Sequence, residues 1–228
     1  MKSKKLVMSI ILCLIAIIIV VYYYFFTSLS KLSATEYIYI DDNDNADSVI
    51  MKLQPVANAH SLSAFKILAR HSDYENHVRT GRYAIKPGNG AATVFRNIKN
   101  GLQTPVNLTI PSVRTIDRLA AELSKKLMTD STSICDALTD EQKCEKLGFD
   151  TTTIVCMFIP NTYDIYWNTS VDKLLERMRK EYTKFWNEER KDKAQRLGMT
   201  PTEVSTLASI IDEETANNEE KPMIAGMY

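Results

Sequence analysis

The amino-terminal part of the chain is dominated by one unbroken apolar run. No charged residue occurs from Leu6 to Phe26, and about twenty apolar residues in a helix cross a hydrocarbon core of roughly 30 Å. A cleavable signal peptide normally has a shorter apolar region, about 7 to 15 residues, that ends at small residues. This run ends instead in the aromatic stretch Tyr22 to Phe26, which is typical of a membrane interface. The pattern favours a retained transmembrane anchor over residues 6–27.

Basic residues near this anchor lie on its amino-terminal side. Lys2, Lys4 and Lys5 precede the apolar run, and the next basic residue after it is Lys31. Because positive charge is retained on the cytoplasmic side, residues 1–5 are expected to form a cytoplasmic tail. The bulk of the chain is then expected outside the membrane.

Residues 28–104 show a mixture of strand and helix patterns. The alternating segment Glu36 to Ile40 and the segment Arg82 to Ile85 predict strands. Helical spacing of apolar residues predicts helices at about 46–53, 61–70 and 91–100, the last one ending at Gly101. This part of the chain is therefore predicted to be one small α+β unit.

A break at Gln103 to Pro105 starts a second α+β pattern that extends to residue 228. Val106 to Ile110 predicts a strand, and Thr115 caps a helix that follows. The polar region 128–150 predicts mostly loop with one short helix. The apolar run 153–158 predicts a buried strand that leads into a turn at 160–163, and Ser170 or Thr169 caps a long amphipathic helix.

The last predicted helix begins at a capping box. Thr200 is its cap, Pro201 its first residue and Glu203 the reciprocal partner, and the helix is expected to reach about Ala216. Its apolar stripe consists of Val204, Leu207, Ala208 and Ile211.

Glu214 continues the apolar stripe of this helix. At 100° per residue, Asp212 and Glu213 face other directions, so Glu214 is the acid expected to point where the apolar residues point. A carboxyl group held against an apolar wall has its charged form disfavoured and can donate a proton near neutral pH. In the alternative interpretation, Glu214 belongs to a frayed last turn within a solvated acidic cluster.

Composition excludes several classes of function. The 28 basic and 28 acidic residues balance, and no basic stripe interleaved with aromatic residues indicates nucleic-acid binding. The four cysteines and three histidines lack metal-ligand spacing, so no metal site is expected. Cys135 and Cys144 could pair in an oxidising compartment, but this would leave Cys156 unpaired outside the membrane. Free thiols are therefore the favoured interpretation.

The segment around Glu214 resembles the signature of the MltG or YceG-like endolytic murein transglycosylases. The string Leu207-Ala208-Ser209-Ile210-Ile211-Asp212-Glu213-Glu214-Thr215, followed by Glu220-Lys221-Pro222-Met223-Ile224-Ala225-Gly226, is similar to that family's Ala-Ser-Ile-(Val/Ile)-Glu-x-Glu-Thr pattern. The second glutamate of the pattern is catalytic in the family, and it corresponds to Glu214. The first one is replaced by Asp212.

Other segments resemble the same family in the same order. Gly81-Arg82-Tyr83 is similar to the Gly-x-Tyr strand of its LysM-like subdomain, and Phe158 to Tyr163 is similar to its Phe-x-Pro-(Asp/Asn)-Thr-Tyr turn. Ser112-Val113-Arg114 departs from the usual Glu-Gly-Trp. The resemblance implies an α+β protein with a LysM-like subdomain at 28–104 and a transglycosylase catalytic domain at 105–228. Family members continue beyond the position of Tyr228, so the catalytic domain is expected to lack its carboxyl-terminal part.

The resemblance implies cleavage of the bond between N-acetylmuramic acid and N-acetylglucosamine within glycan strands, leaving 1,6-anhydro ends. Glu214 would be the general acid and base, and no metal or organic cofactor would be required. Peptidoglycan would be the partner, at the bacterial cytoplasmic (inner) membrane. The cell-wall synthesis machinery is a candidate protein partner, and the sequence does not indicate substrate-binding residues. Two alternatives stay open: a non-catalytic membrane-anchored scaffold that binds cell wall, and a water-using muramidase, which is disfavoured because no second acid shares the face of Glu214.

The charge asymmetry about the apolar run predicts that residues 31–228 lie outside the cytoplasm. A phosphatase that is active only outside the cytoplasm should therefore be active when fused after Tyr228. Activity only of a cytoplasmic reporter at the same position would contradict this topology.

Overall fold

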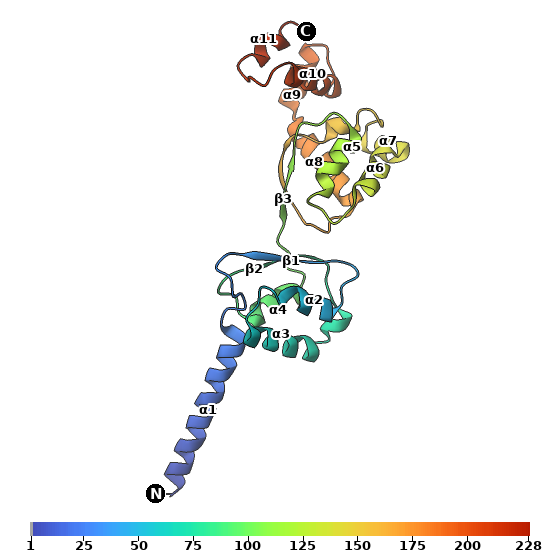
Figure 1. Cartoon of the computed structure of the whole chain (residues 1–228). Coiled ribbons are helices and arrows are strands. Elements are labelled where there is room, and N and C mark those ends of the chain that lie inside the picture. The colour runs from blue at the N-terminus through green and yellow to red at the C-terminus, as the bar shows by residue number, and fades with distance from the viewer. Residues whose placement is uncertain (1) are drawn as a thin grey trace. The chain divides into compact units, whose positions relative to one another are not determined.

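The computed structural model describes residues 2–228 and divides them into two compact units. Unit 1 extends to Pro105, and unit 2 begins at Val106. Both units combine helices with a two-stranded antiparallel sheet, which confirms the α+β fold class (Figure 1). Met1, the first residue of the expected cytoplasmic tail, lies outside the described residues.

Unit 1 begins with a long apolar helix. The segment Lys4 to Phe26 of this helix is long and apolar enough to cross a membrane, and its apolar side chains are mostly exposed. The elements of unit 1 are α1 (Lys2–Phe26), β1 (Glu36–Ile40), α2 (Ala46–Leu53), α3 (Ala59–His71), the 3₁₀ turn η1 (Tyr74–Asn76), β2 (Gly81–Ile85) and α4 (Ala91–Lys99).

The core of unit 1 lies between the β1–β2 sheet and its helices. Ile38 and Tyr83 face each other across the two strands, and both are buried. Beneath them, the rings of Phe65, Tyr74 and Phe95 pack edge to face, with centroids 5.4 to 6.4 Å apart. This geometry is favourable for aromatic pairs, so side chains of α3, η1 and α4 share one aromatic cluster.

The segment after α1 is part of unit 1 and does not form a free linker. Leu29 is fully buried, and its neighbours Ser28 and Ser30 form β-bridges with Gly90 and Ala57. A Cβ atom at Gly90 would lie 2.6 Å from the carbonyl oxygen of Phe25, so only glycine allows this close approach. The direction of α1 relative to the rest of unit 1 is therefore set by packing.

Unit 2 contains one strand pair, a set of short helices and three terminal helices. Its elements are β3 (Val106–Ile110), α5 (Ile116–Ser124), α6 (Ser131–Thr139), α7 (Glu141–Leu147), the 3₁₀ turn η2 (Ile154–Met157), β4 (Asn161–Ile165), α8 (Val171–Phe185), α9 (Glu188–Arg196), α10 (Pro201–Glu214) and α11 (Lys221–Ala225).

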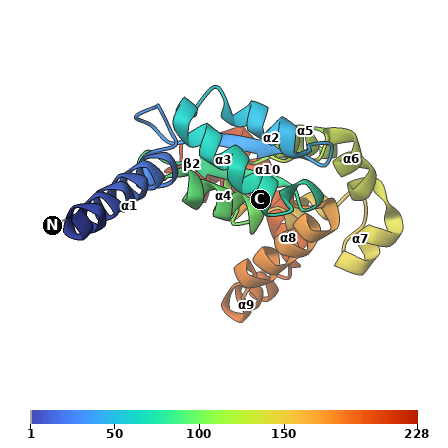
Figure 2. The ribbon, with the colours of Figure 1, turned by 90° about the horizontal axis from the view of Figure 1, so that it is seen from below.

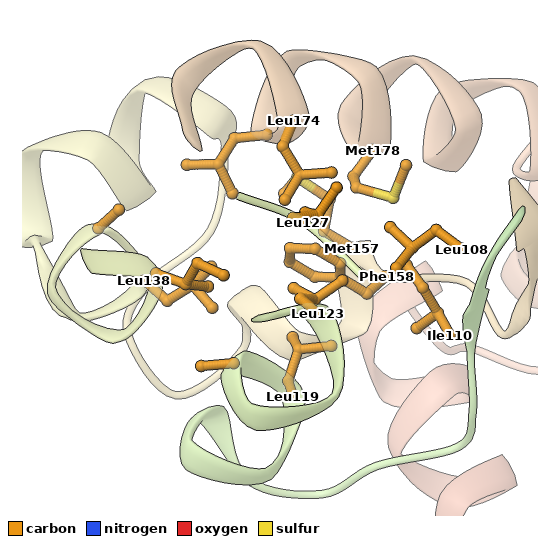
Figure 3. Close-up of a cluster of buried hydrophobic side chains, with 14 of the residues drawn as sticks. Leu108, Ile110, Leu119, Leu123, Leu127, Leu138, Met157, Phe158, Leu174 and Met178 are labelled. Atoms are coloured by element: carbon orange, nitrogen blue, oxygen red, sulfur yellow. The ribbon is translucent and has the colours of Figure 1, made fainter. Parts of the chain in front are cut away.

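The core of unit 2 is built from alternate residues of β3 and from one face of each surrounding helix. Val106, Leu108 and Ile110 are buried, while the residues between them are exposed. Figure 3 shows how Leu108 and Ile110 meet buried side chains of α5, η2 and α8, among them Leu119, Leu123, Met157, Leu174 and Met178. The amphipathic helices predicted from the sequence are therefore confirmed as walls of one core.

The two units repeat the same local plan. In each, a five-residue connection joins the first strand to a helix, and another five-residue connection joins the second strand to a helix. The registers also agree, because the third residues of the paired strands face each other: Ile38 opposite Tyr83, and Leu108 opposite Tyr163.

The two tyrosines also make the same hydrogen bond. The Tyr83 hydroxyl donates to the carbonyl of Arg79 at 2.9 Å, and the Tyr163 hydroxyl donates to the carbonyl of Ile159 at 2.7 Å. Each acceptor lies four residues before its tyrosine. The first half of unit 2 is thus a structural counterpart of unit 1, with α7 inserted before the second strand.

Two element predictions for unit 2 are wrong. The apolar run at 153–158 forms η2 and not a strand, and the segment predicted as a turn forms β4. The Asp150 carboxylate accepts hydrogen bonds from the backbone and hydroxyl groups of Thr152 and Thr153, which turns the chain into a helical conformation. Strand pairing with β3 then selects residues 161–165.

The region 128–150 contains two helices where one short helix was predicted. Asp130 caps α6 and Asp140 caps α7 through hydrogen bonds from backbone amides. Each helix buries few residues, notably Ile134, Leu138 and Cys144. Because most of its residues are polar, the sequence shows no clear apolar stripe. Packing of α6 against α5 and α8 stabilises these short helices.

The fully buried Leu108 allows a direct test of this core. Leu108→Ala should reduce the free energy of unfolding by about 2 to 5 kcal/mol, because it removes transfer energy and leaves a cavity. Asn107→Ala, at the exposed neighbouring position of β3, should change it by no more than about 0.5 kcal/mol. Denaturant titration measures both, and equal effects would show that β3 does not have this orientation.

A second test concerns pH. Hydrogen bonds from the side chains and backbone of Thr152 and Thr153 lower the pKa of Asp150 from 3.8 to about 2. Because the folded pKa is depressed, the stabilisation is present above about pH 4 and is lost as the pH falls toward 2. Asp150→Asn should therefore lower the denaturation midpoint at neutral pH and have progressively less effect from pH 4 to 2. A pH-independent difference would contradict the role of the carboxylate.

Candidate functional site

The helix that carries the candidate acid begins as predicted. The backbone amide of Thr200 donates to the Glu203 carboxylate at 2.7 Å, and the amide of Glu203 donates to the Thr200 hydroxyl at 3.2 Å. The donated backbone hydrogen bond holds the pKa of Glu203 below its ordinary value. This confirms the capping box. The helix ends at Glu214, two residues before the predicted end, because Thr215 is extended.

Glu214 is exposed at the last position of α10. The expectation that it lies against an apolar wall of the core is therefore wrong, since Ile211 is the last buried residue of the helix. No element of the core extends one turn further. Glu214 lies instead beside a hollow of about 300 Å³ that it lines together with Ile224, Met227 and Tyr228.

Asp212 lies on the opposite edge of the apolar stripe of α10. Its carboxylate accepts a hydrogen bond at 2.6 Å from the ammonium group of Lys221 in α11. That hydrogen bond is the main reason why the pKa of Asp212 lies below its ordinary value, and a hydrogen bond with Ser112 adds to it. Asp212 is therefore ionised at neutral pH.

Glu213 forms an ion pair with the loop that follows β3. Its carboxylate lies 2.5 Å from the guanidinium group of Arg114, and both side chains are more than half exposed. An exposed pair of this kind stabilises the fold by at most about 1 kcal/mol. The pair connects the end of α10 to Ser112-Val113-Arg114, the segment that stands where the family's usual motif is Glu-Gly-Trp.

A wide groove of about 730 Å³ runs along α10 on the side of Asp212. Its lining is largely apolar and comes from the loop after β3, the η2 region, the end of α8, α9 and α10. Three basic residues border it, namely Arg114, Arg190 and Lys193. The guanidinium group of Arg190 lies 4.2 Å from the ring centroid of Phe185, a favourable cation–π arrangement.

Sequence analysis missed this groove because its walls come from five separate segments. One of them, α9, was not predicted, since its mainly charged sequence shows no apolar stripe. Asn187 caps α9 by accepting from the Arg190 amide at 3.0 Å. The adjacent aromatic pair Phe185-Trp186 at the end of an amphipathic helix was the available signal.

Trp186 contributes an unusual polar group to the groove lining. The residue is only 5% exposed, and its indole N–H is buried with no hydrogen-bond partner among the described residues. A buried donor without a partner costs free energy, on the order of 1 to 3 kcal/mol. The unpaired indole N–H of Trp186 therefore lowers the stability of the groove wall.

The cysteines do not supply a nucleophile. All four are free thiols among the described residues, and Cys156 lies in the groove wall. Burial raises the pKa of the Cys144 and Cys156 thiols. Because the thiolate is the reactive form, both are poor nucleophiles at neutral pH, and the carboxylates of α10 are the stronger candidates for chemistry.

Comparison with known proteins gives a family match over most of the chain. The model of the YceG-like family matches residues 38–228. A crystal structure of the YceG-like protein lmo1499 from Listeria monocytogenes is similar with a TM-score of 0.48 and 15% sequence identity. That similarity covers 83% of this chain and 67% of the Listeria chain. No curated protein matches this chain.

Proposed function

This chain belongs to the YceG-like family, and on that premise we propose that it is an endolytic lytic transglycosylase of peptidoglycan with Glu214 as its general acid and base. Its substrate is the bond between N-acetylmuramic acid and N-acetylglucosamine inside glycan strands. The family match includes the whole of α10 and α11. The proposal therefore concerns residues that lie within the matched segment.

The observation that carries the assignment is the pairing of the three consecutive acids. Lys221 holds Asp212 as a carboxylate, and Arg114 pairs with Glu213. Among the described residues, Glu214 alone of the three has no cation within ion-pair distance. The carboxyl group of Glu214 is accessible and its oxygens are not occupied by an ion pair, so they are free to contact the glycosidic oxygen of a bound strand.

The proposed reaction needs one enzyme acid. Glu214 protonates the glycosidic oxygen as the bond from that oxygen to C1 of N-acetylmuramic acid breaks. The 6-hydroxyl of the same sugar then forms a new bond to C1 and returns its proton to Glu214. The products are a free 4-hydroxyl on N-acetylglucosamine and a 1,6-anhydro end, and the enzyme regains its starting protonation state.

A muramidase that uses water is the weaker alternative for this site. Such enzymes place two carboxyl groups across the scissile bond, about 5 Å or 6.5 to 9.5 Å apart. Asp212 and Glu214 lie two residues apart on a helix and line different hollows, so they do not flank a common bond. A reaction that uses the hydroxyl of the substrate itself avoids this requirement.

The remaining parts of the chain have roles that follow from the same proposal. Residues 28–104 act as the LysM-like unit that binds glycan, and residues 105–228 carry the chemistry. The helix α1 anchors the protein in the bacterial cytoplasmic membrane with its amino terminus inside. Peptidoglycan strands are the partner, and the cell-wall synthesis machinery is the candidate protein partner.

A scaffold that binds cell wall without cutting it is the second candidate function, and it is supported by the exposed position of Glu214.

Glu214→Gln should reduce the release of anhydro-ended fragments from purified peptidoglycan by about 10² to 10⁴, because an amide cannot supply the proton. The change is at an exposed position, so the free energy of unfolding should change by no more than about 0.5 kcal/mol. Mass spectrometry of the fragments measures the first effect, and denaturant titration the second.

Glu219→Gln is the matched control, because Glu219 is an exposed glutamate five residues away and should retain full activity. Asp212→Asn tests the other acid and should keep substantial activity. Reducing ends in place of anhydro ends would indicate the muramidase, and binding without cleavage would indicate the scaffold. Loss of activity in Asp212→Asn together with an unaffected Glu214→Gln would move the catalytic role to Asp212.

A further inference from the structure

The two helices of unit 1 that contact α1 have a one-sided charge. Helices α3 and α4 both pack against α1. They carry Lys66, Arg70, Arg96 and Lys99, and neither helix contains an aspartate or a glutamate. Five of the seven acids of unit 1 lie from Glu36 to Asp47, in β1, the turn after it and the start of α2, and the other two, Asp73 and Glu75, follow the end of α3.

The carboxyl end of α1 is attached directly to α3. The ring of Tyr23 stacks on His60 with centroids 4.3 Å apart, and the Thr27 hydroxyl lies 3.0 Å from the His60 ring nitrogen Nε2. The side-chain amide of Asn58 donates to the carbonyl groups of Ser28 and Ser30. Together with the bridges of Ser28 and Ser30, these contacts fix the direction in which α1 leaves the rest of unit 1.

The face of unit 1 on the side of α1 is the outer surface of α3 and α4. In Figure 1 the β1–β2 sheet lies on the far side of unit 1 from the amino terminus of α1, and α3 lies on the near side. Seen from below, in Figure 2, α3 and α4 face the viewer. Lys66, Arg70 and Arg96 are exposed on these two helices, and the apolar side chain of Ile67, which follows Lys66 in the sequence, is 48% exposed.

We propose that this basic face, formed by Lys66, Ile67, Arg70 and Arg96, binds anionic phospholipid headgroups of the membrane that α1 spans. The proposal rests on α1 being a membrane span and is independent of the chemistry assigned to Glu214. Basic side chains near an anionic membrane surface contribute about 1 kcal/mol each, and an exposed apolar residue beside them adds burial at the interface. Unit 1 is thereby held against the membrane.

A tryptophan at position 67 reports whether this face contacts the membrane surface. The full chain with Ile67→Trp is reconstituted in vesicles of phosphatidylcholine, with or without phosphatidylglycerol, each containing a trace of lipid that carries a quenching spin label on its headgroup. The fluorescence of the parent protein, which contains Trp167 and Trp186, is subtracted. Quenching of the new tryptophan should be stronger in the vesicles that contain phosphatidylglycerol, and salt should reverse it. Tyr39→Trp, at an exposed position of β1 on the face away from the core, should be quenched weakly in both.

Charge variants identify the groups responsible. Adding Lys66→Gln and Arg70→Gln to the Ile67→Trp protein should shift the ratio of docked to undocked unit 1 by roughly 30-fold, which is the loss of two contributions of about 1 kcal/mol. The matched control is Lys180→Gln with Lys184→Gln, an exposed pair at the same spacing on α8, and it should leave the quenching unchanged.

Three results would overturn the proposal. They are equal quenching in both vesicle compositions, quenching that salt does not reverse, and equal effects of the two charge pairs. Circular dichroism establishes that each variant is folded, and the salt titration tests the parent charges without any change at Lys66 or Arg70. Glycan cleavage by the same proteins is measured separately, so failure of lipid binding is distinguishable from failure of the proposed enzyme activity.

Discussion

Each unit of this protein depends on one antiparallel pair of five-residue strands with a single buried face. A two-stranded sheet is at best marginally stable in water, so its apolar face must be covered by helices. In both units that face places an aliphatic residue opposite a tyrosine, Ile38 with Tyr83 and Leu108 with Tyr163. The tyrosine hydroxyl also closes the turn before its own strand. Packing and hydrogen bonding at this one residue therefore connect the sheet to its covering helices and to the turn that precedes the strand.

The repeated plan also explains two of the family resemblances. Gly81-Arg82-Tyr83 and Asn161-Thr162-Tyr163 occupy the first three positions of β2 and β4, so the two motifs describe the same structural position in two units. A sequence comparison would not relate them, because only the tyrosine is shared. What they have in common is the need for a ring that fills the core and a hydroxyl that reaches a carbonyl four residues earlier.

The candidate site departs from the rules that stabilise helices. Three acids stand in the last turn of α10, where the helix dipole is negative and basic residues are favourable. Lys221 and Arg114 offset two of these charges from neighbouring segments. The third, Glu214, is left at the end of the helix beside the hollow formed with Ile224 and Tyr228. Unfavourable local choices of this kind are expected at functional sites, where chemistry and not stability selects the residue.

The sequence alone was sufficient for features that depend on local spacing. The apolar run of α1, the strands β1 and β3 and the capping box of α10 were predicted because periodicity, length and capping act within a few residues. Tertiary structure decided the features that depend on partners distant in sequence. Residues 161–165 became a strand because β3 pairs with them, while Asp150 directed the more apolar run before them into a helical turn. The groove has walls from five segments, and Glu214 is exposed because no core element reaches the last turn of α10. No periodicity within one helix can encode either of these outcomes.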